Sequence, residues 1–155
     1  MTPARIAAFT LAAVAATAAA WALWPAATPA VAAGGIPHDD AAAVARGKPL
    51  YAAHCAACHG ADLAGQPNWR VPDAEGFLPA PPHDASGHTW HHPDDQLFAI
   101  TKLGTAALVG GDYRTRMIGF GEVLSDDDIL AVLAYVKSTW PPGIIARHDQ
   151  INASR

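Results

Sequence analysis

Two cysteines and a histidine stand close together in the segment HCAACHG at positions 54–60. Cys55 and Cys58 are the only cysteines of the chain, and His59 directly follows the second one. Thiols can pair with each other, ligate a metal or react with a cofactor, and an imidazole can ligate a metal. Four kinds of site are compatible with these residue types at this spacing.

Three of the four leave part of the pattern unexplained. A disulfide between Cys55 and Cys58 would suit an exported protein, but it gives His59 no role. A thioredoxin-like redox pair needs a βαβ context, which the sequence lacks. A zinc site needs further thiolates or histidines at defined spacing, and no second ligand pair is obvious.

The fourth kind of site, covalent attachment of haem, gives each residue a role. C-x-x-C-H is the sequence signal for c-type haem attachment. Residues three apart lie on one side of a helical turn, so both sulfurs can form thioethers with the vinyl groups of one porphyrin edge. The imidazole can then bond the iron. We therefore expect Cys55 and Cys58 to hold one haem c, with His59 as an iron ligand.

Met117 is the candidate for a thioether ligand on the iron. The only other methionine is Met1, which lies in the N-terminal leader. Met117 stands 58 positions after His59, in a Gly-rich segment beside Arg116. A methionine is most often a core filler, but this segment is a poor context for one.

A first helix is predicted at residues 40–54, directly before the attachment motif. Pro49 complicates it, because a proline inside a helix removes one hydrogen bond and clashes with the preceding turn. The helix should therefore begin near Gly47 or kink at Pro49. Residues 60–92 have no sustained period and are predicted to form a long irregular loop, of the kind that carries function.

Two further helices are predicted at 92–104 and 125–142. In the first, Pro93 fits the first helical position and Gly104 fits the stop. In the second, Ser125 and Asp128 resemble a capping box. The expected apolar stripes are Leu97, Ile100 and Leu103 in the first helix, and Ile129, Val132, Leu133, Val136 and Trp140 in the second.

The first 33 residues are predicted to direct export. Arg5 is the only charge, residues 6–24 are uncharged, and Ala30-Val31-Ala32 offers a cleavage site. This is the pattern of a signal peptide, although nineteen residues could also span a membrane as an anchor. Either outcome places the rest of the chain in the periplasm or elsewhere outside the cytoplasm, soluble or anchored.

After this leader we expect a linker at 34–39, one domain at 40–143 and a weakly patterned tail at 144–155. Another loop is expected at 105–124. Without Arg5, nine basic against fourteen acidic residues leave a net charge of −5. A chain this acidic has no electrostatic footprint for nucleic acid, and a monomer is expected.

The chain resembles the class I cytochromes c, in particular small exported bacterial monohaem members, over most of residues 40–141. The resemblance rests on the attachment motif, on Gly47 with Leu50-Tyr51, on Tyr135, and on the segment from Met117 onward. It implies an all-α fold of three main helices and long loops around one haem. It also implies His59 and Met117 as axial ligands, and an electron carrier rather than an enzyme, with transient redox partner proteins.

Two departures from this family bear on the site. Ile118 stands where a proline usually follows the ligand methionine and stiffens its loop. The loop at 60–92 is also longer than in the simplest members. In the family a loop carbonyl near a proline accepts the N–H of the ligand histidine, and Pro79, Pro81 and Pro82 are the candidates.

Other functions stay open. Four histidines fall within ten residues, which could form a copper or zinc site or, singly, replace Met117 on the iron. A polar loop whose histidines bond to backbone or haem propionates is the simpler interpretation. If Met117 were displaceable, the protein could instead be an open-site haem peroxidase or gas-binding protein. The four histidines are His83, His88, His91 and His92.

Overall fold

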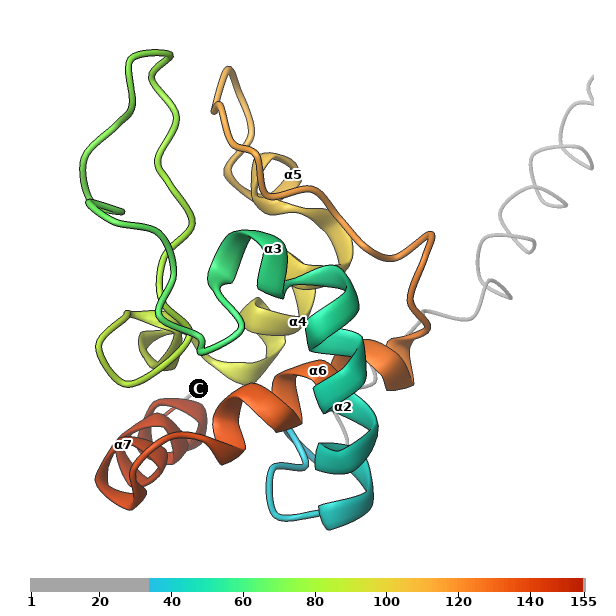
Figure 1. The fold of residues 1–155 in the computed structure, drawn as a ribbon. Helices are drawn as coiled ribbons and strands as arrows, with labels where there is room; N and C mark the ends of the chain where they lie inside the picture. The colour runs from blue at the N-terminus through green and yellow to red at the C-terminus, as the bar shows by residue number, and fades with distance from the viewer. Residues whose placement is uncertain (1–33, 155) are drawn as a thin grey trace, which may run out of the picture.

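The structure, a computed structural model, describes residues 34–154, which form helices joined by loops, without strands (Figure 1). The leader predicted at 1–33 lies outside the described residues. The elements are α2 (Ala41–His54), α3 (Ala56–His59), a 3-10 turn η2 (Thr89–His91), α4 (Asp94–Leu103), α5 (Thr105–Val109), α6 (Asp126–Ser138) and α7 (Pro142–Ala153). The predicted all-α class is confirmed, with α2, α4 and α6 as the three predicted helices. None of the helices in the described range is long and apolar enough to cross a membrane.

The first helix runs through its proline. α2 begins at Ala41, where the side chain of Asp40 accepts a hydrogen bond from the backbone N–H of Ala42 at 2.8 Å. The prediction of a start near Gly47 is therefore wrong. Pro49 has no backbone N–H to donate to the carbonyl of Ala45. Both residues are exposed, so water can donate a hydrogen bond to that carbonyl instead.

α2 and α6 cross and form the most extensive helix–helix contact of the described chain. At the crossing Gly47 is buried, and a Cβ built on it would lie 1.8 Å from the carbonyl oxygen of Ala131. The rings of Tyr51 and Tyr135 meet beside it, with their centroids 5.5 Å apart. Gly47 and Tyr135, two of the residues on which the resemblance rests, therefore lie together where the helices cross.

α6 follows its sequence pattern. Ser125 and Asp128 form the predicted capping box, in which each side chain accepts a hydrogen bond from the backbone N–H of the other. This arrangement satisfies two of the N–H groups that a helix start leaves unpaired. The whole predicted stripe, Ile129, Val132, Leu133, Val136 and Trp140, is buried.

α4 is present, but its buried face differs from the prediction. Pro93 is the N-cap rather than the first helical residue, and Gly104 ends the helix at φ +84°, where glycine is favoured. Leu103 is 54% exposed, whereas Phe98 is buried. The buried side of the helix follows the spacing Asp94, Leu97, Phe98 and Thr101, which places Leu103 on the other side.

The helices α5 and α7 differ from the sequence prediction. The segment 105–124 contains α5 as well as loop, and residues of the expected tail belong to α7. α7 is held by polar contacts: His148, fully buried, bonds to the carbonyl of His92 at 2.9 Å, and Lys137 of α6 pairs with Asp149 at 2.7 Å. An apolar period is weak in α7 because His148 is the one fully buried residue of this helix.

The segment 34–39, expected as a linker, is also attached to the domain. Ile36 is buried, and its backbone N–H donates to Oδ2 of Asp94 at 2.9 Å. The backbone N–H of Asp94 in turn donates to Oδ1 of Asn152 at 2.8 Å. The start of α4 therefore joins the N-terminal segment to α7.

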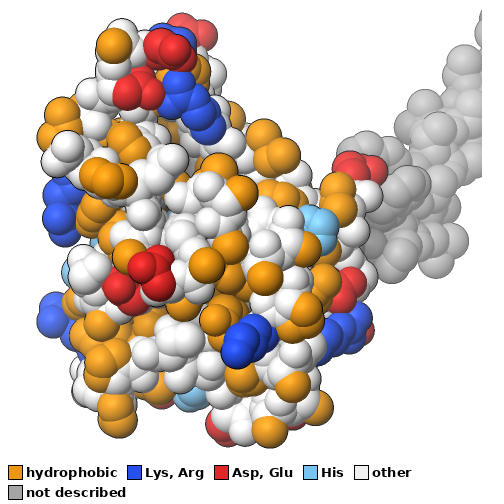
Figure 2. Space-filling view, in the orientation of Figure 1, with side chains coloured by type: hydrophobic (Ala, Val, Ile, Leu, Met, Phe, Trp, Pro, Cys, Tyr) orange, Lys and Arg blue, Asp and Glu red, His pale blue; other side chains and the backbone are white. Residues whose placement is uncertain are grey.

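Two loops project from the same end of the molecule, one from residues 60–80 and one from residues 110–118 (Figure 1). Acidic and basic side chains gather there, while hydrophobic side chains are scattered over the rest of this face (Figure 2). These two loops flank α3, which carries the end of the attachment motif.

Candidate functional site

The cysteine pair lies at the junction of α2 and α3. The backbone stays nearly helical across it, since Cys55 bonds to the carbonyl of Tyr51 and His59 bonds to the carbonyl of Cys55, both at 2.9 Å. Cys55 is buried, Cys58 is exposed, and both are free thiols. The predicted disulfide alternative is therefore not formed, and both sulfurs remain available for another bond.

Burial also keeps one of the thiols neutral. Removal from water, and next the neighbouring Cys58, raise the pKa of Cys55 to about 11. A thiol with such a pKa carries its proton at neutral pH. A neutral thioether would suit the buried position of Cys55, because it carries no charge that burial would penalise.

His59 is held in one orientation by the loop that follows it. Its ring is 7% exposed, and Nδ1 lies 2.8 Å from the carbonyl oxygen of Pro81. A carbonyl can only accept, so Nδ1 carries the proton and Nε2 keeps its lone pair. Burial lowers the pKa of His59 despite the opposing effect of this hydrogen bond, so the ring is neutral. Of the three candidate prolines, Pro81 supplies the carbonyl.

His83 and Tyr51 complete the surroundings of His59. The ring of His83 stacks on that of His59 with centroids 3.8 Å apart and 18° between the planes. Burial and the nearby His59 lower the pKa of His83 well below its usual range, and its buried Nδ1 has no hydrogen-bond partner in the described chain. Tyr51 packs edge-on against His83 and donates its hydroxyl to the carbonyl of Gly60 at 3.0 Å.

Sequence reasoning did not place these two neighbours at the site. In the sequence, His83 is one of four clustered histidines and Tyr51 belongs to a predicted helix. The available signal was position: His83 follows Pro81 by two residues, and Tyr51 precedes Cys55 by one helical turn.

Met117 is placed through its backbone. Its side chain is half-buried, its N–H donates to Oγ1 of Thr115 at 3.0 Å, and its carbonyl accepts from the N–H of Thr105 at 3.4 Å. The next residue, Ile118, pairs with Gly104 in an isolated β-bridge. No hydrogen bond or ring contact links Met117 to His59 in the described chain, so its role as iron ligand stays a prediction.

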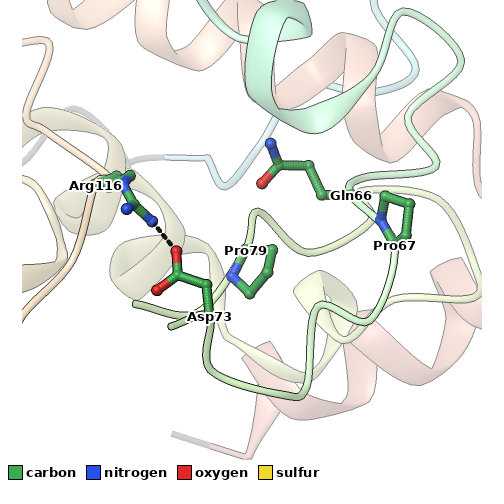
Figure 3. Close-up of a pocket in the computed structure, with 5 residues that line it drawn as sticks. All are labelled: Gln66, Pro67, Asp73, Pro79 and Arg116. Atoms are coloured by element: carbon green, nitrogen blue, oxygen red, sulfur yellow. Dashed lines mark hydrogen bonds and ion pairs between the residues drawn. The ribbon is translucent and has the colours of Figure 1, made fainter. Parts of the chain in front are cut away.

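A pocket of about 390 Å³ opens between the two projecting loops (Figure 3). Arg116, directly before Met117, reaches across it to Asp73 of the other loop. The pocket thus lies between the segment that carries Met117 and the segment that leads to Pro81. Its lining residues are Gln66, Pro67, Asp73, Pro79 and Arg116.

Two of the four clustered histidines contact each other, since the rings of His88 and His92 lie edge to face with centroids 5.2 Å apart. The other two point elsewhere: His83 stacks on His59, and His91 packs on Trp90 at 3.7 Å between centroids. The other neighbour of His88 is Trp69, at 5.1 Å between centroids. In residues 34–154 no group of three or more His, Cys, Asp or Glu side chains is placed to hold a metal ion.

The residues at the α2–α3 junction fit the haem c that the motif predicts. Two unpaired thiols lie three positions apart on a near-helical segment, and a neutral imidazole beside them keeps one nitrogen lone pair free. A carbonyl that binds the other ring nitrogen is the usual way in which a protein orients a histidine ligand.

Comparison with known proteins agrees with this donor set. A family model described as "Cytochrome c" matches residues 44–140, which include the cysteine pair, His59 and Met117. Neither the curated proteins nor the solved structures contain a match to the chain.

Proposed function

Because this chain belongs to the cytochrome c family, we propose that it is a monohaem electron carrier with His59 and Met117 as axial ligands. Cys55 and Cys58 would hold the haem through two thioethers. When bound, the haem iron supplies a one-electron Fe(III)/Fe(II) couple. The hydrogen bond from Nδ1 of His59 to the carbonyl of Pro81 is the observation that carries the proposal, since it leaves Nε2 free to bond iron.

Each ligand has a distinct part in this function. His59 contributes a buried, neutral and oriented imidazole, so iron binding needs no deprotonation and little reorientation. Met117 contributes a neutral thioether, which favours reduced iron and raises the potential relative to two imidazoles. With both axial positions filled by protein residues, neither O₂ nor a substrate has a place on the iron, which favours a carrier over an enzyme.

The cellular setting follows from the leader and from the redox role. We propose that the protein works outside the cytoplasm, in the periplasm if the cell has one, either soluble or anchored through residues 1–33. Its partners would be redox proteins that dock weakly, over small interfaces. We expect the carrier to be a monomer.

The experiment is a spectrum of protein produced with a functional haem-maturation apparatus. The pyridine derivative of the reduced protein should report one haem with two thioether bonds, and the oxidised protein should show the weak long-wavelength band of iron–methionine bonding. Met117→Ala should keep the haem, lose this band and lower the midpoint potential. A colourless product with two titratable thiols would contradict the proposal. High-spin spectra and immediate carbon monoxide binding in the wild type would instead favour an open-site haem protein.

A further inference from the structure

Two arginines that precede Met117 join its segment to the other projecting loop. The guanidinium of Arg116 contacts two carboxylates, with Nη1 2.5 Å from Oδ2 of Asp73 and Nη2 2.6 Å from Oε2 of Glu75. Nη1 of Arg114 donates to the backbone carbonyl of Glu75 at 2.8 Å. Both guanidinium groups also lie over the ring of Phe77, at 4.3 Å for Arg114 and 4.1 Å for Arg116.

The turn that receives these arginines, residues 73–77, is ordered by its own hydrogen bonds. Oδ1 of Asp73 accepts from the N–H groups of Glu75 at 3.0 Å and Phe77 at 2.9 Å. The backbone N–H of Asp73 donates to the carbonyl of Phe77 at 2.9 Å. Asp73 therefore uses one carboxylate oxygen to shape the turn and the other to bind Arg116, which makes the turn a defined partner.

The segment before Met117 has few other attachments. In the described chain, the N–H of Gly110 bonds to the carbonyl of Ala106 in the preceding α5 at 2.9 Å. All other hydrogen bonds, ion pairs and ring contacts that tie residues 110–116 to another segment come from Arg114 and Arg116. Gly110 and Gly111 have positive φ and open space around them. Beyond Met117 the chain is held differently, by the bridge of Ile118 to Gly104 and by the N–H of Phe120 on Thr101.

From these contacts we propose that Arg116, supported by Arg114, is a positioning residue for Met117. By binding the 73–77 turn it fixes the approach of the chain to Met117 and keeps the thioether in place on the iron. This inference rests on the proposed function, because it presumes that Met117 is a ligand. Ile118 is not a proline, so no ring stiffens the chain after Met117; its backbone bridge to Gly104 holds only that side of Met117, and the approach from residues 110–116 depends on the arginines.

Because Arg116 is partly exposed, its replacement should affect the position of Met117 more than the stability of the whole protein. Arg116 is about half exposed, and exposed ion pairs contribute little to global stability. A small free-energy difference is, however, enough to change how often Met117 leaves the iron. The apparent affinity of imidazole, which competes with Met117 for the iron, rises in proportion to the fraction of protein in which Met117 is released. Removal of Arg116 should therefore loosen Met117 without unfolding the protein.

The test is imidazole binding to the oxidised holoprotein. We expect Arg116→Gln to raise the apparent affinity for imidazole about fivefold and to weaken the iron–methionine band, since the loss of the exposed ion pairs to Asp73 and Glu75 changes a population by about that factor. Arg116→Lys, which keeps the charge but cannot bind both carboxylates in a fork, should be intermediate. Haem content and urea midpoint should stay unchanged.

Arg70→Gln is the matched control. Arg70 lies in the 60–80 loop and stacks on Trp69 at 4.0 Å, but it has no contact with the Met117 segment. It should bind imidazole as the wild type does. Asp73→Asn should reproduce the effect of Arg116→Gln, and the double variant should add little to either single one.

The outcomes separate the two proposals. Suppose that Met117→Ala loses the iron–methionine band, whereas Arg116→Gln keeps both this band and the wild-type affinity for imidazole. The positioning role of Arg116 would then be wrong, while Met117 would remain the ligand. If Met117→Ala leaves the wild-type spectrum and potential intact, both the axial assignment and the positioning role fall. If Arg70→Gln raised the affinity for imidazole as much as Arg116→Gln does, the positioning role of Arg116 would also be wrong, because the loss of any positive charge in the loops would then have the same effect.

Discussion

Gly47 in α2 lies directly against the backbone of Ala131 in α6. A Cβ on Gly47 would lie 1.8 Å from the carbonyl oxygen of Ala131 and 2.4 Å from its carbonyl carbon. No side chain can move aside there, because both contacts are with backbone. The crossing of the two helices, and with it the position of the cysteine pair at the end of α2, depends on the absence of a side chain at this residue.

Gly47→Ala should therefore destabilise the protein by about 3 kcal/mol or more, because the helices must separate to admit the methyl group. Urea unfolding of the holoprotein measures the change. Gly143→Ala is the control: Gly143 lies in α7 with nothing within 4 Å of the built Cβ, so the replacement should be neutral or slightly stabilising. Equal effects of the two substitutions would refute the close crossing.

Tyr51 should make the protein sensitive to alkali. Burial, followed by nearby negative charge, raises the pKa of its hydroxyl far above the ordinary value of about 10. The unfolded chain then releases this proton more readily than the folded one, so stability is retained below pH ~10 and falls as the pH rises above it. Unfolding free energies measured across this range should fall less steeply in Tyr51→Phe, and Tyr113→Phe, at a 40% exposed residue, should behave as the wild type.

Asp128 should contribute to acid stability. Its hydrogen bond with Ser125, then its contacts with Arg46 of α2, lower the pKa of the carboxyl. A lowered folded-state pKa gives stability that is present above the unfolded value of about 3.9 and is lost as the pH falls through the folded one. The unfolding free energies of the wild type and Asp128→Asn should therefore differ at pH 7 and converge in acid. Asp127→Asn, which changes charge at the adjacent position, should show no such convergence.

His148 should make the attachment of α7 depend on pH. Burial, and next the positive charge of Lys137, lower its pKa, against the opposing effects of Asp94, the His92 carbonyl and Asp149. The unfolded histidine binds a proton more readily, so stability is present above pH ~6.5 and falls as the pH drops below it. Hydrogen exchange of α7 amides should accelerate between pH 7 and 5 in the wild type.

His148→Gln provides the check on this prediction, since its amide can still donate to the carbonyl of His92 but does not titrate in this range. Exchange of α7 amides should then lose its acid dependence after correction for the intrinsic rate. A wild-type slope that persists in His148→Gln would assign the effect to another group.

Some features could be predicted because they are encoded within a few neighbouring residues. The cysteine pair with His59 is one contiguous motif, and the start and buried face of α6 follow from a capping box and a 3.6-residue period. Such patterns are local, so they can be recognised without knowing where the rest of the chain lies. The candidate site could thus be located, and the all-α class inferred, from the sequence.

The tertiary structure decided what depends on contacts between distant residues. It selected Pro81 from three prolines, stacked His83 on His59 and placed Pro49 inside α2. It also drew His83 away from His88 and His92, and joined Arg116 to Asp73 and Glu75, which lie 43 and 41 positions earlier in the chain. No local pattern specifies these pairings, because each is set by the packing of helices and loops around one core, which brings together groups that no sequence spacing relates.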